Sequence, residues 1–142
     1  MAGEIAKEII NYLLKEDVGA IVVEDLKFRK DHDTYKKFNR LTHCFTYKKI
    51  LDCLIRSGFL VKKVNPAYTS IIGRFKYTKH FGLSVHESAS LVIGRRGLGF
   101  NEKIPKKLIR IIENFKTTHK WSLWNVVNKT LLLKEYKFVI KF

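Results

Sequence analysis

The sequence predicts an α/β protein with parallel strands and a helical C-terminal tail. The first observation is a β-branched apolar run that ends in two acids, Ala20-Ile21-Val22-Val23-Glu24-Asp25-Leu26; such a run is typical of a strand buried on both faces. The second is the order of a strand over Ile21–Leu26, a helix over Phe45–Arg56 and a strand over Phe59–Val64. This order predicts a βαβ unit, whose strands are parallel and adjacent. The third is the length of 142 residues, which suits one domain.

The remaining elements follow from apolar spacing. Glu4–Lys15 has one apolar face and is followed by Asp17-Val18-Gly19, which ends the helix. The segment Lys27–Arg40 is strongly polar, and we expect a solvated loop with at most a helical turn near Tyr35–Phe38. Helices are also predicted over Ser84–Arg96, over Lys106–Lys116 and around Trp121 and Trp124. The alternating segment Leu131–Phe142 is expected to add a strand or to cover a sheet edge.

The charge of the chain favours a polyanionic partner. Lys and Arg number 28 against 13 Asp and Glu, a formal net charge of +15, and such an excess most often indicates nucleic acid, although a membrane surface remains an alternative. No run approaches the roughly 18 apolar residues of a membrane span, and no signal peptide is expected at the N-terminus. Cys44 and Cys53 lie nine residues apart, which predicts neither a zinc site nor a disulfide framework. A cytoplasmic protein that does not interact with membranes is therefore expected.

Glu24 is the first candidate site residue. A carboxylate at the C-terminal end of a buried parallel strand lies where open α/β sheets bind ligands. The alternative is that Glu24 and Asp25 only solvate the end of the strand. The triplet Asp31-His32-Asp33 is interpreted as a hydrophilic turn, because its tight spacing provides no shaped metal site.

Two later segments carry further candidates. The stretch Arg74-Phe75-Lys76-Tyr77-Thr78-Lys79-His80-Phe81 interleaves cations and aromatic rings, which suits phosphates and stacked bases; the alternative is a connecting segment whose rings pack inward. Ser84 and Glu87 have the spacing of a capping box, so Glu87 has local capping as its alternative role. His86 lies in the first turn of the same predicted helix.

Three separated pieces of the sequence carry a family resemblance. They are Ile21-Val22-Val23-Glu24-Asp25-Leu26, Val64-Asn65-Pro66-Ala67-Tyr68-Thr69-Ser70 and the helix from Ser84 to Ile93 with Gly94-Arg95-Arg96-Gly97-Leu98-Gly99. Together they resemble the C-terminal part of the TnpB-type proteins of insertion sequences, and most closely the divergent TnpB-related accessory proteins. The resemblance covers roughly residues 4 to 115. It implies a partial RuvC-like domain of the RNase H fold over residues 4–96, with a helical extension over 97–142.

The resemblance implies an RNA-guided DNA endonuclease that belongs to a mobile genetic element, with DNA and a guide RNA as partners. Members of this family hydrolyse phosphodiesters with two Mg²⁺ or Mn²⁺ ions that are held by three acidic groups. Glu24 matches the second acid of that set, and His86 falls in the position of the third. Neutral imidazole can bind a catalytic metal. Glu87 takes that position only if the register slips by one residue.

The chain also departs from the family pattern. The strand that carries the first catalytic aspartate lies upstream of the Glu4–Lys15 helix in the family and is not found here, and Ile71-Ile72-Gly73-Arg74 stands where the family's zinc-ribbon cysteines would follow. We therefore expect a C-terminal fragment that does not cut DNA alone. Its exposed strand edge is expected to cause poor solubility, to lead to self-association, or to be covered by the Leu131–Phe142 segment.

A function of another class is a non-catalytic basic module that binds nucleic acid. Its candidate residues are the cations of the second half of the chain: Arg74, Lys76, Lys79, Arg95, Arg96, Lys106, Lys107 and Arg110. The two functions are distinguished by whether Glu24 and His86 converge within metal-ligand reach.

Overall fold

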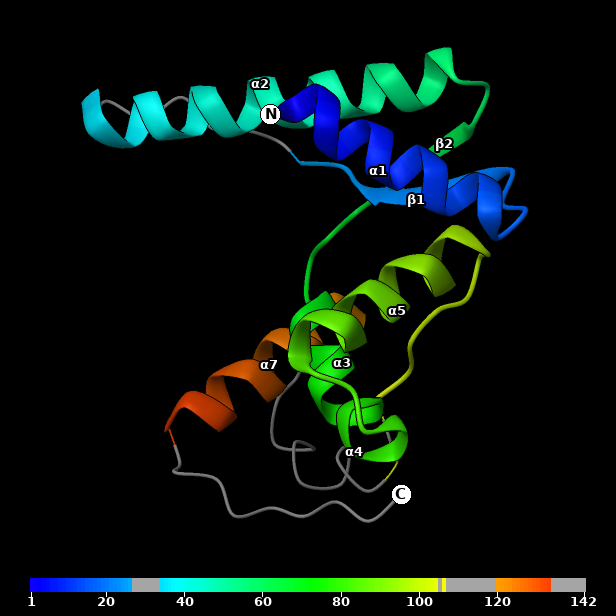
Figure 1. Ribbon diagram of the computed structural model, residues 1–142. Coiled ribbons are helices and arrows are strands. Elements are labelled where there is room, and N and C mark those ends of the chain that lie inside the picture. The colour runs from blue at the N-terminus through cyan, green and yellow to red at the C-terminus, as the bar shows by residue number, and fades with distance from the viewer. Residues whose placement is uncertain (27–33, 105, 107–119, 134–142) are drawn as a thin grey trace. The chain divides into compact units, whose positions relative to one another are not determined.

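The chain forms two compact units, unit 1 (Met1–Asn65) and unit 2 (Pro66–Phe142). The computed structural model describes residues 1–26, 34–104, 106 and 120–133. Helices and strands alternate along unit 1, whereas the described part of unit 2 is helical (Figure 1). The core predicted over residues 4–96 therefore spans the boundary between the two units.

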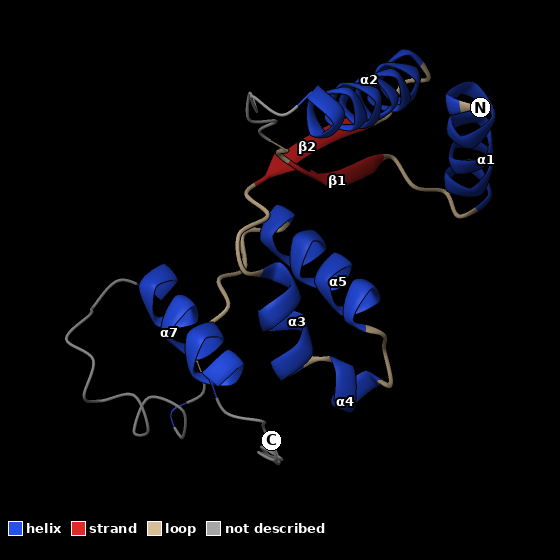
Figure 2. Ribbon diagram, turned by 90° about the vertical axis from the view of Figure 1, so that its left-hand side faces the viewer, coloured by secondary structure: helices blue, strands red, loops and turns tan. Residues whose placement is uncertain are grey.

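Unit 1 contains a parallel pair of strands joined through a helix. In chain order it comprises α1 (Ala2–Lys15), β1 (Ala20–Glu24), α2 (Thr34–Arg56) and β2 (Leu60–Val64). The register of the pair sets Ala20 beside Leu60 and Glu24 beside Val64. The prediction that these two strands are adjacent and parallel is confirmed, and the α/β class with it. Figure 2 shows the two strands side by side, with α2 lying along them.

The core of unit 1 lies between the two helices and one face of the sheet. Leu51, Leu54 and Phe59 are buried at its centre, and partly buried side chains from α1 and from both strands pack against them. The strand residues in this cluster are Ile21, Val23 and Val61. Because side chains alternate along a strand and Ile21 pairs with Val61, these three share one face. Both helices therefore contribute side chains to the same side of the sheet.

The prediction that β1 is buried on both faces is wrong. Residues Ile21 to Glu24 are half-buried and Ala20 is exposed. In the part of the chain that the structure describes, β1 and β2 form a sheet of two strands and pair only with each other. Each strand thus has one hydrogen-bonding edge without a strand neighbour in that sheet, and self-association through such an edge stays a prediction.

The polar segment before the second helix differs from expectation. Residues 34–40, predicted to belong to a solvated loop, form the first turns of α2, which runs from Thr34 to Arg56. The first part of α2 lacks regular apolar spacing, so the pattern that marks amphipathic helices did not reveal it. A different signal was present: the sequence contains neither Gly nor Pro between Gly19 and Gly58, so nothing in it breaks a helix that is rich in Lys and Arg.

Unit 2 consists, in its described part, of α3 (Thr69–Lys76), α4 (Thr78–Phe81), α5 (Val85–Gly97) and α7 (Lys120–Leu133). Its core is formed by apolar side chains from α3, α5, α7 and the segment before residue 105: Ile72, Val92, Ile104, Trp124 and Val127. The predicted helix over Ser84–Arg96 is confirmed, including its capping box. The predicted helix around the two tryptophans is confirmed as α7.

Contact between α3 and α5 depends on small residues. A Cβ atom added to Gly73 would lie 2.7 Å from the backbone carbonyl carbon of Ser88 and 2.8 Å from the backbone nitrogen of Ala89. Ser88 and Ala89 are themselves buried. The backbones of the two helices thus approach one another at a point where no larger residue fits.

Three sequence-based predictions concern segments outside the described residues in whole or in part, and the predicted turn Asp31-His32-Asp33 lies wholly outside them. Of the predicted helix over Lys106–Lys116, only Lys106 is described, and it is helical. Leu131–Leu133 belong to α7 and not to a strand, while the rest of the predicted alternating segment lies outside the described residues.

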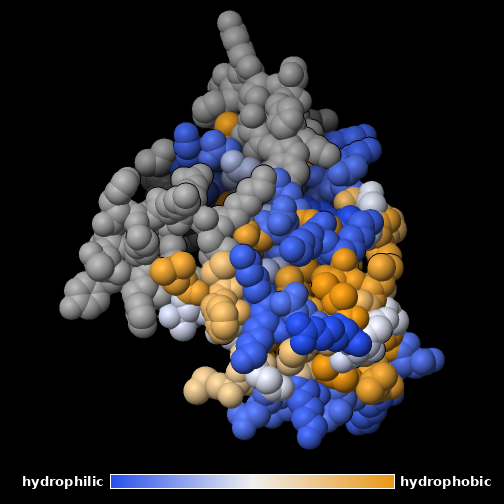
Figure 3. All heavy atoms as spheres, turned by 90° about the horizontal axis from the view of Figure 1, so that it is seen from above, coloured by the Kyte–Doolittle hydropathy of each residue, from blue (hydrophilic) through white to orange (hydrophobic). Residues whose placement is uncertain are grey.

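Hydrophobic side chains are exposed on the surface among hydrophilic ones. In unit 1, Phe45 and Leu60 are each 69% exposed, and the space-filling view shows hydrophobic residues among hydrophilic ones (Figure 3). None of the helices within the described ranges combines the length and the apolar character that crossing a membrane requires.

Candidate nucleic-acid interface

The acidic end of β1 forms hydrogen bonds with α2 and with β2. The Tyr47 hydroxyl of α2 donates a hydrogen bond to the backbone carbonyl of Glu24, and the backbone N–H of Asp25 donates to the carbonyl of Val64 at 2.7 Å. Burial raises the pKa of Tyr47, and the negative charges of Glu24 and Asp25 raise it further. The two carboxylates therefore lie close enough to Tyr47 to act on its hydroxyl.

The described residues do not form a complete metal site. No three side chains of His, Cys, Asp or Glu come together among them in a way that could hold a metal ion. Glu24 and Asp25 offer two carboxylates from one strand end, whereas a two-metal centre is held by more ligands than two. Glu24 belongs to unit 1 and His86 to unit 2, so the convergence of these two side chains stays a prediction.

The two candidates at the start of α5 are both exposed. The Glu87 carboxylate accepts a hydrogen bond from the Ser84 backbone N–H at 2.7 Å, and the Ser84 hydroxyl accepts one from the Glu87 N–H at 3.2 Å. These hydrogen bonds with Ser84 lower the pKa of Glu87. Glu87 therefore has the capping role that was its alternative interpretation, while His86 projects from the same turn and its carbonyl accepts a hydrogen bond from the Ser90 hydroxyl.

A hydrogen bond joins two of the three sequence pieces that carry the family resemblance. The Arg96 guanidinium at the end of α5 donates from Nη2 to the carbonyl of Ala67 at 2.8 Å. Ala67 lies in the turn that precedes α3, where Thr69 donates to the Pro66 carbonyl through both its N–H and its hydroxyl. Burial lowers the pKa of Arg96. Arg96, predicted to bind nucleic acid, thus holds this turn against α5.

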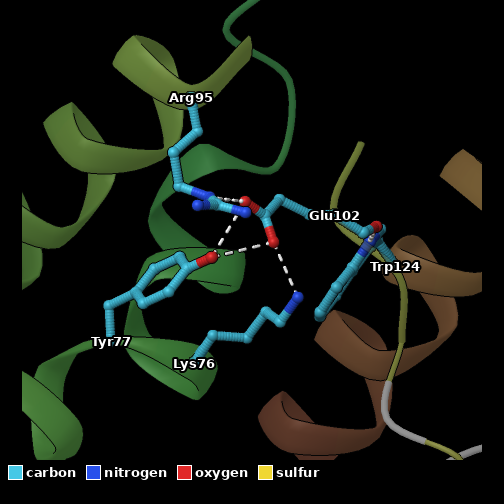
Figure 4. Close-up of polar contacts among 5 residues, drawn as sticks. All are labelled: Lys76, Tyr77, Arg95, Glu102 and Trp124. Atoms are coloured by element: carbon cyan, nitrogen blue, oxygen red, sulfur yellow. Dashed lines mark hydrogen bonds and ion pairs between the residues drawn. The ribbon is translucent and has the colours of Figure 1, made fainter. Parts of the chain in front are cut away.

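Two other predicted nucleic-acid ligands, Lys76 and Arg95, converge on a carboxylate. Lys76 Nζ lies 2.6 Å from Oε2 of Glu102, and Arg95 Nε lies 2.6 Å from its Oε1. The Tyr77 hydroxyl donates to the same carboxylate at 2.9 Å, and Trp124 of α7 donates its indole N–H to the backbone carbonyl of Glu102 at 3.2 Å. Figure 4 shows these side chains pointing toward Glu102 from α3, α5, α7 and the turn between α3 and α4.

The Glu102 carboxylate is almost completely enclosed, with 2% of its side chain exposed. Burial acts to raise its pKa, but the hydrogen bonds from Lys76, Arg95 and Tyr77 outweigh burial, and the net pKa lies below its ordinary value. Burial and the hydrogen bond to Glu102 raise the pKa of Tyr77 to about 12. At neutral pH, Glu102 is therefore ionised and Tyr77 is a neutral donor.

The charge is unevenly divided between the units. Residues 1–65 contain 13 Lys and Arg against 9 Asp and Glu, a difference of +4, whereas residues 66–142 contain 15 against 4, a difference of +11. Arg74, Lys79 and Lys106 are exposed, while Lys107 and Arg110 lie outside the described residues. Of the four acids of unit 2, Glu102 is buried among cations and Glu87 caps α5. The described surface of unit 2 is therefore strongly basic.

Sequence reasoning missed Tyr47 and Glu102. Nothing in the sequence indicated that Tyr47 would contact the end of β1, because Tyr47 and Glu24 are 23 positions apart. For Glu102 a signal existed, since it is the one acid in the basic stretch from Arg95 to Arg110. An isolated acid among cations indicates a charge that those cations neutralise.

No protein-family model matches the chain, and no match to it was found among the curated proteins or among the solved structures.

Proposed function

We propose that this chain is part of a transposon-associated DNA endonuclease of the TnpB type, with a RuvC-like domain of the RNase H fold, and that it binds DNA and a guide RNA. The observation that carries the proposal is the acidic end of β1. Glu24 lies beside Val64 of the parallel strand β2, and the run Asn65-Pro66-Ala67-Tyr68-Thr69-Ser70 follows directly. Metal-binding acids in open α/β sheets lie at such carboxyl ends of strands.

In this proposal Glu24, at the end of β1, binds a Mg²⁺ or Mn²⁺ ion, and the role of His86 as a further ligand stays a prediction from the family resemblance. Carboxylate oxygens such as those of Glu24 suit both ions, and the role of such ions would be to activate water and to stabilise the leaving oxygen of a phosphodiester. Since two metal ions need more ligands than Glu24 and His86 provide, we expect the chain by itself to bind a metal weakly and not to cut DNA.

Paramagnetic broadening of amide NMR signals by Mn²⁺ tests the proposal. Signals of residues near the end of β1 should broaden at low Mn²⁺ concentrations, and Glu24→Gln should abolish this broadening. Asp52→Asn is a matched control, because it removes an equal charge from an exposed position on α2. Should Mn²⁺ leave these signals sharp, or should Asp52→Asn reduce the broadening as much as Glu24→Gln does, the proposed metal site would be wrong.

The alternative proposal is a non-catalytic module that binds nucleic acid through unit 2. The formal difference of +11 between basic and acidic residues in unit 2 favours it. Affinity for DNA, measured by fluorescence anisotropy, should then fall steeply with salt, by roughly 0.7 to 0.9 log units per log unit of salt for each phosphate neutralised. Salt-dependent binding without Mn²⁺ broadening near Glu24 would select this alternative, and absence of binding at low salt would exclude both proposals.

A further inference from the structure

Aromatic rings and one guanidinium form a continuous row on unit 2. The Phe81 ring stacks on Tyr77, with 6.0 Å between ring centroids. The guanidinium carbon of Arg95 lies 5.7 Å from the centroid of the Tyr77 ring and 4.6 Å from that of Phe100. The row therefore runs Phe81, Tyr77, Arg95, Phe100, and we call it the ring row. It joins α4, the turn before it, α5 and the segment after α5.

Both ends of the ring row are open to solvent. Phe81 is 56% exposed and Phe100 is 51% exposed. Phe75, which belongs to the same basic aromatic stretch of sequence, packs against the core of unit 2, and so does the half-buried Tyr77 in the middle of the row. The rings of that stretch are thus divided between the two roles considered from the sequence, and Phe100, which the sequence did not single out, lies at the opposite end of the row from Phe81.

The buried acid Glu102 fixes the middle of the row. Its carboxylate accepts hydrogen bonds from both Tyr77 and Arg95. The ionic hydrogen bond to Glu102 therefore holds Arg95 beside two rings before any ligand binds. Little conformational entropy of this side chain is left to be lost on binding. A pre-organised surface of this kind avoids much of the side-chain entropy that binding otherwise costs.

Charge around the row is complementary to a phosphate backbone. Lys79 and His80 are exposed on α4 next to Phe81, and the His80 ring meets the Phe81 ring edge-on at 4.6 Å. The two acids of unit 2 that the structure describes are engaged elsewhere, Glu87 in its capping box and Glu102 beneath the row. A polyanion with exposed flat rings fits such a surface, whereas a polyanion without rings uses only its charge.

We propose that the ring row is a stacking platform for unpaired bases of single-stranded nucleic acid, an inference that rests on the proposed binding of nucleic acid by unit 2. Base–aromatic stacking tolerates any sequence, because every base has a π-face, and arginine adds a cation–π contribution. Bases within a duplex already stack on their neighbours and present only their edges in the grooves. The platform therefore selects single strands over duplexes.

Three probes separate stacking from charge with the wild-type protein. They are a single-stranded oligonucleotide, the same-length oligonucleotide with abasic sites throughout, and the duplex form, all followed by fluorescence anisotropy at one salt concentration. The affinity for the single strand should be at least about tenfold higher than that for the abasic strand, since stacking contributes about 1–3 kcal/mol per base. Equal affinity for the single strand and the abasic strand would overturn the platform while leaving the proposed function intact.

Ring-removing variants locate the effect. Phe81→Leu and Phe100→Leu should each weaken single-strand binding by about fivefold or more, without changing the slope of affinity against salt, because neither removes a charge. Phe45→Leu is a matched control, since Phe45 is 69% exposed and lies on α2 of unit 1. Lys79→Gln should instead reduce the salt slope.

The outcomes are distinguishable. If Phe45→Leu weakens binding as much as the two row variants, or if the row variants weaken abasic-strand binding equally, the ring row is not the stacking surface. If no probe binds even at low salt, the proposed binding of nucleic acid itself fails. Thermal melts of each variant identify any loss of affinity that arises from unfolding. The comparison of the three probes uses the wild-type protein and does not depend on a variant that folds.

Discussion

Replacing Glu102 by Gln should lower the free energy of unfolding of unit 2. Among substitutions that remove one charge from the described residues of this unit, we expect it to cause the largest loss. The substitution keeps the size of the side chain and one carbonyl oxygen, but removes the negative charge. Lys76 and Arg95 are both ion-paired with that charge at 2.6 Å. The Tyr77 hydroxyl can still donate to the amide oxygen, so the loss is chiefly ionic.

The expected loss of stability depends on how far solvent reaches the two cations that pair with Glu102. Breaking a fully buried ion pair costs about 3–5 kcal/mol, because the remaining charge has no solvent. Here the Lys76 and Arg95 side chains are 23% and 35% exposed, so water can solvate them in part, and exposed pairs contribute much less. We expect a loss of about 2–3 kcal/mol in the free energy of unfolding, which lies between these limits.

Tryptophan fluorescence during urea unfolding measures this loss in unit 2 alone. The chain contains two Trp, at positions 121 and 124, and both lie in unit 2. With a slope of about 2 kcal/mol per molar urea, the midpoint of Glu102→Gln should fall by about 1 to 1.5 M. Glu87→Gln is a matched control because it removes an equal charge from an exposed carboxylate, and glutamine can also form a capping box.

Either of two results would refute the reasoning. An unchanged midpoint in Glu102→Gln would mean that the buried carboxylate contributes no net stability, as happens when desolvation cancels the attraction. Equal losses in Glu102→Gln and Glu87→Gln would mean that net charge, and not the contacts of Glu102, sets the stability of unit 2.

Further predictions concern the same unit. Gly73→Ala should lower the free energy of unfolding by at least about 2 kcal/mol, since the added Cβ meets backbone atoms of α5 at 2.7 Å; an unchanged urea midpoint would contradict this. Ser88→Ala should leave stability unchanged or raise it by up to about 1 kcal/mol, because the buried Ser88 hydroxyl has no hydrogen-bond partner among the described residues; a clear loss would count against it. The lowered pKa of Glu102 contributes stability that is present above the unfolded pKa of about 4.3 and is lost as pH falls through the folded value, so the acid dependence of the urea midpoint should weaken in Glu102→Gln. The pKa of Tyr77, raised from 10.0 to about 12, contributes stability that is present below pH 10 and is lost as pH rises toward 12, and Tyr77→Phe should remove that alkaline dependence.

The parallel strand pair could be predicted because its signals are local. The run Ile21–Glu24 is β-branched and continuous, and the helix and strand that follow are bounded by Gly58 and Pro66. The α5 helix was equally predictable, since Ser84 and Glu87 have capping-box spacing and make both hydrogen bonds. Local hydrogen bonds and turn residues act within a few positions, so the sequence displays them directly.

The start of α2 and the helical form of the basic aromatic stretch could not be predicted in the same way. Thr34–Arg40 lacks the apolar period on which the prediction of helices relied. In the stretch from Arg74 to Phe81, α3 ends at Lys76 and α4 begins at Thr78, so cations and rings that alternate in sequence are distributed over two helices. Which rings are buried then depends on packing against α5 and α7, which is tertiary information.

The cations of unit 2 show why a charge count identified a class of partner but not the residues that bind it. A sequence gives each lysine and arginine the same weight, whereas the structure divides them by the partners they already have. Lys76 and Arg95 pair with Glu102, and Arg96 donates to a backbone carbonyl. Arg74, Lys79 and Lys106 are exposed instead. Counterion release counts only cations that meet phosphates, at about 0.7 log units each for a single strand. The salt slope should therefore be smaller than the eight cations predicted from sequence would give, and a slope near that full value would contradict this division of the cations.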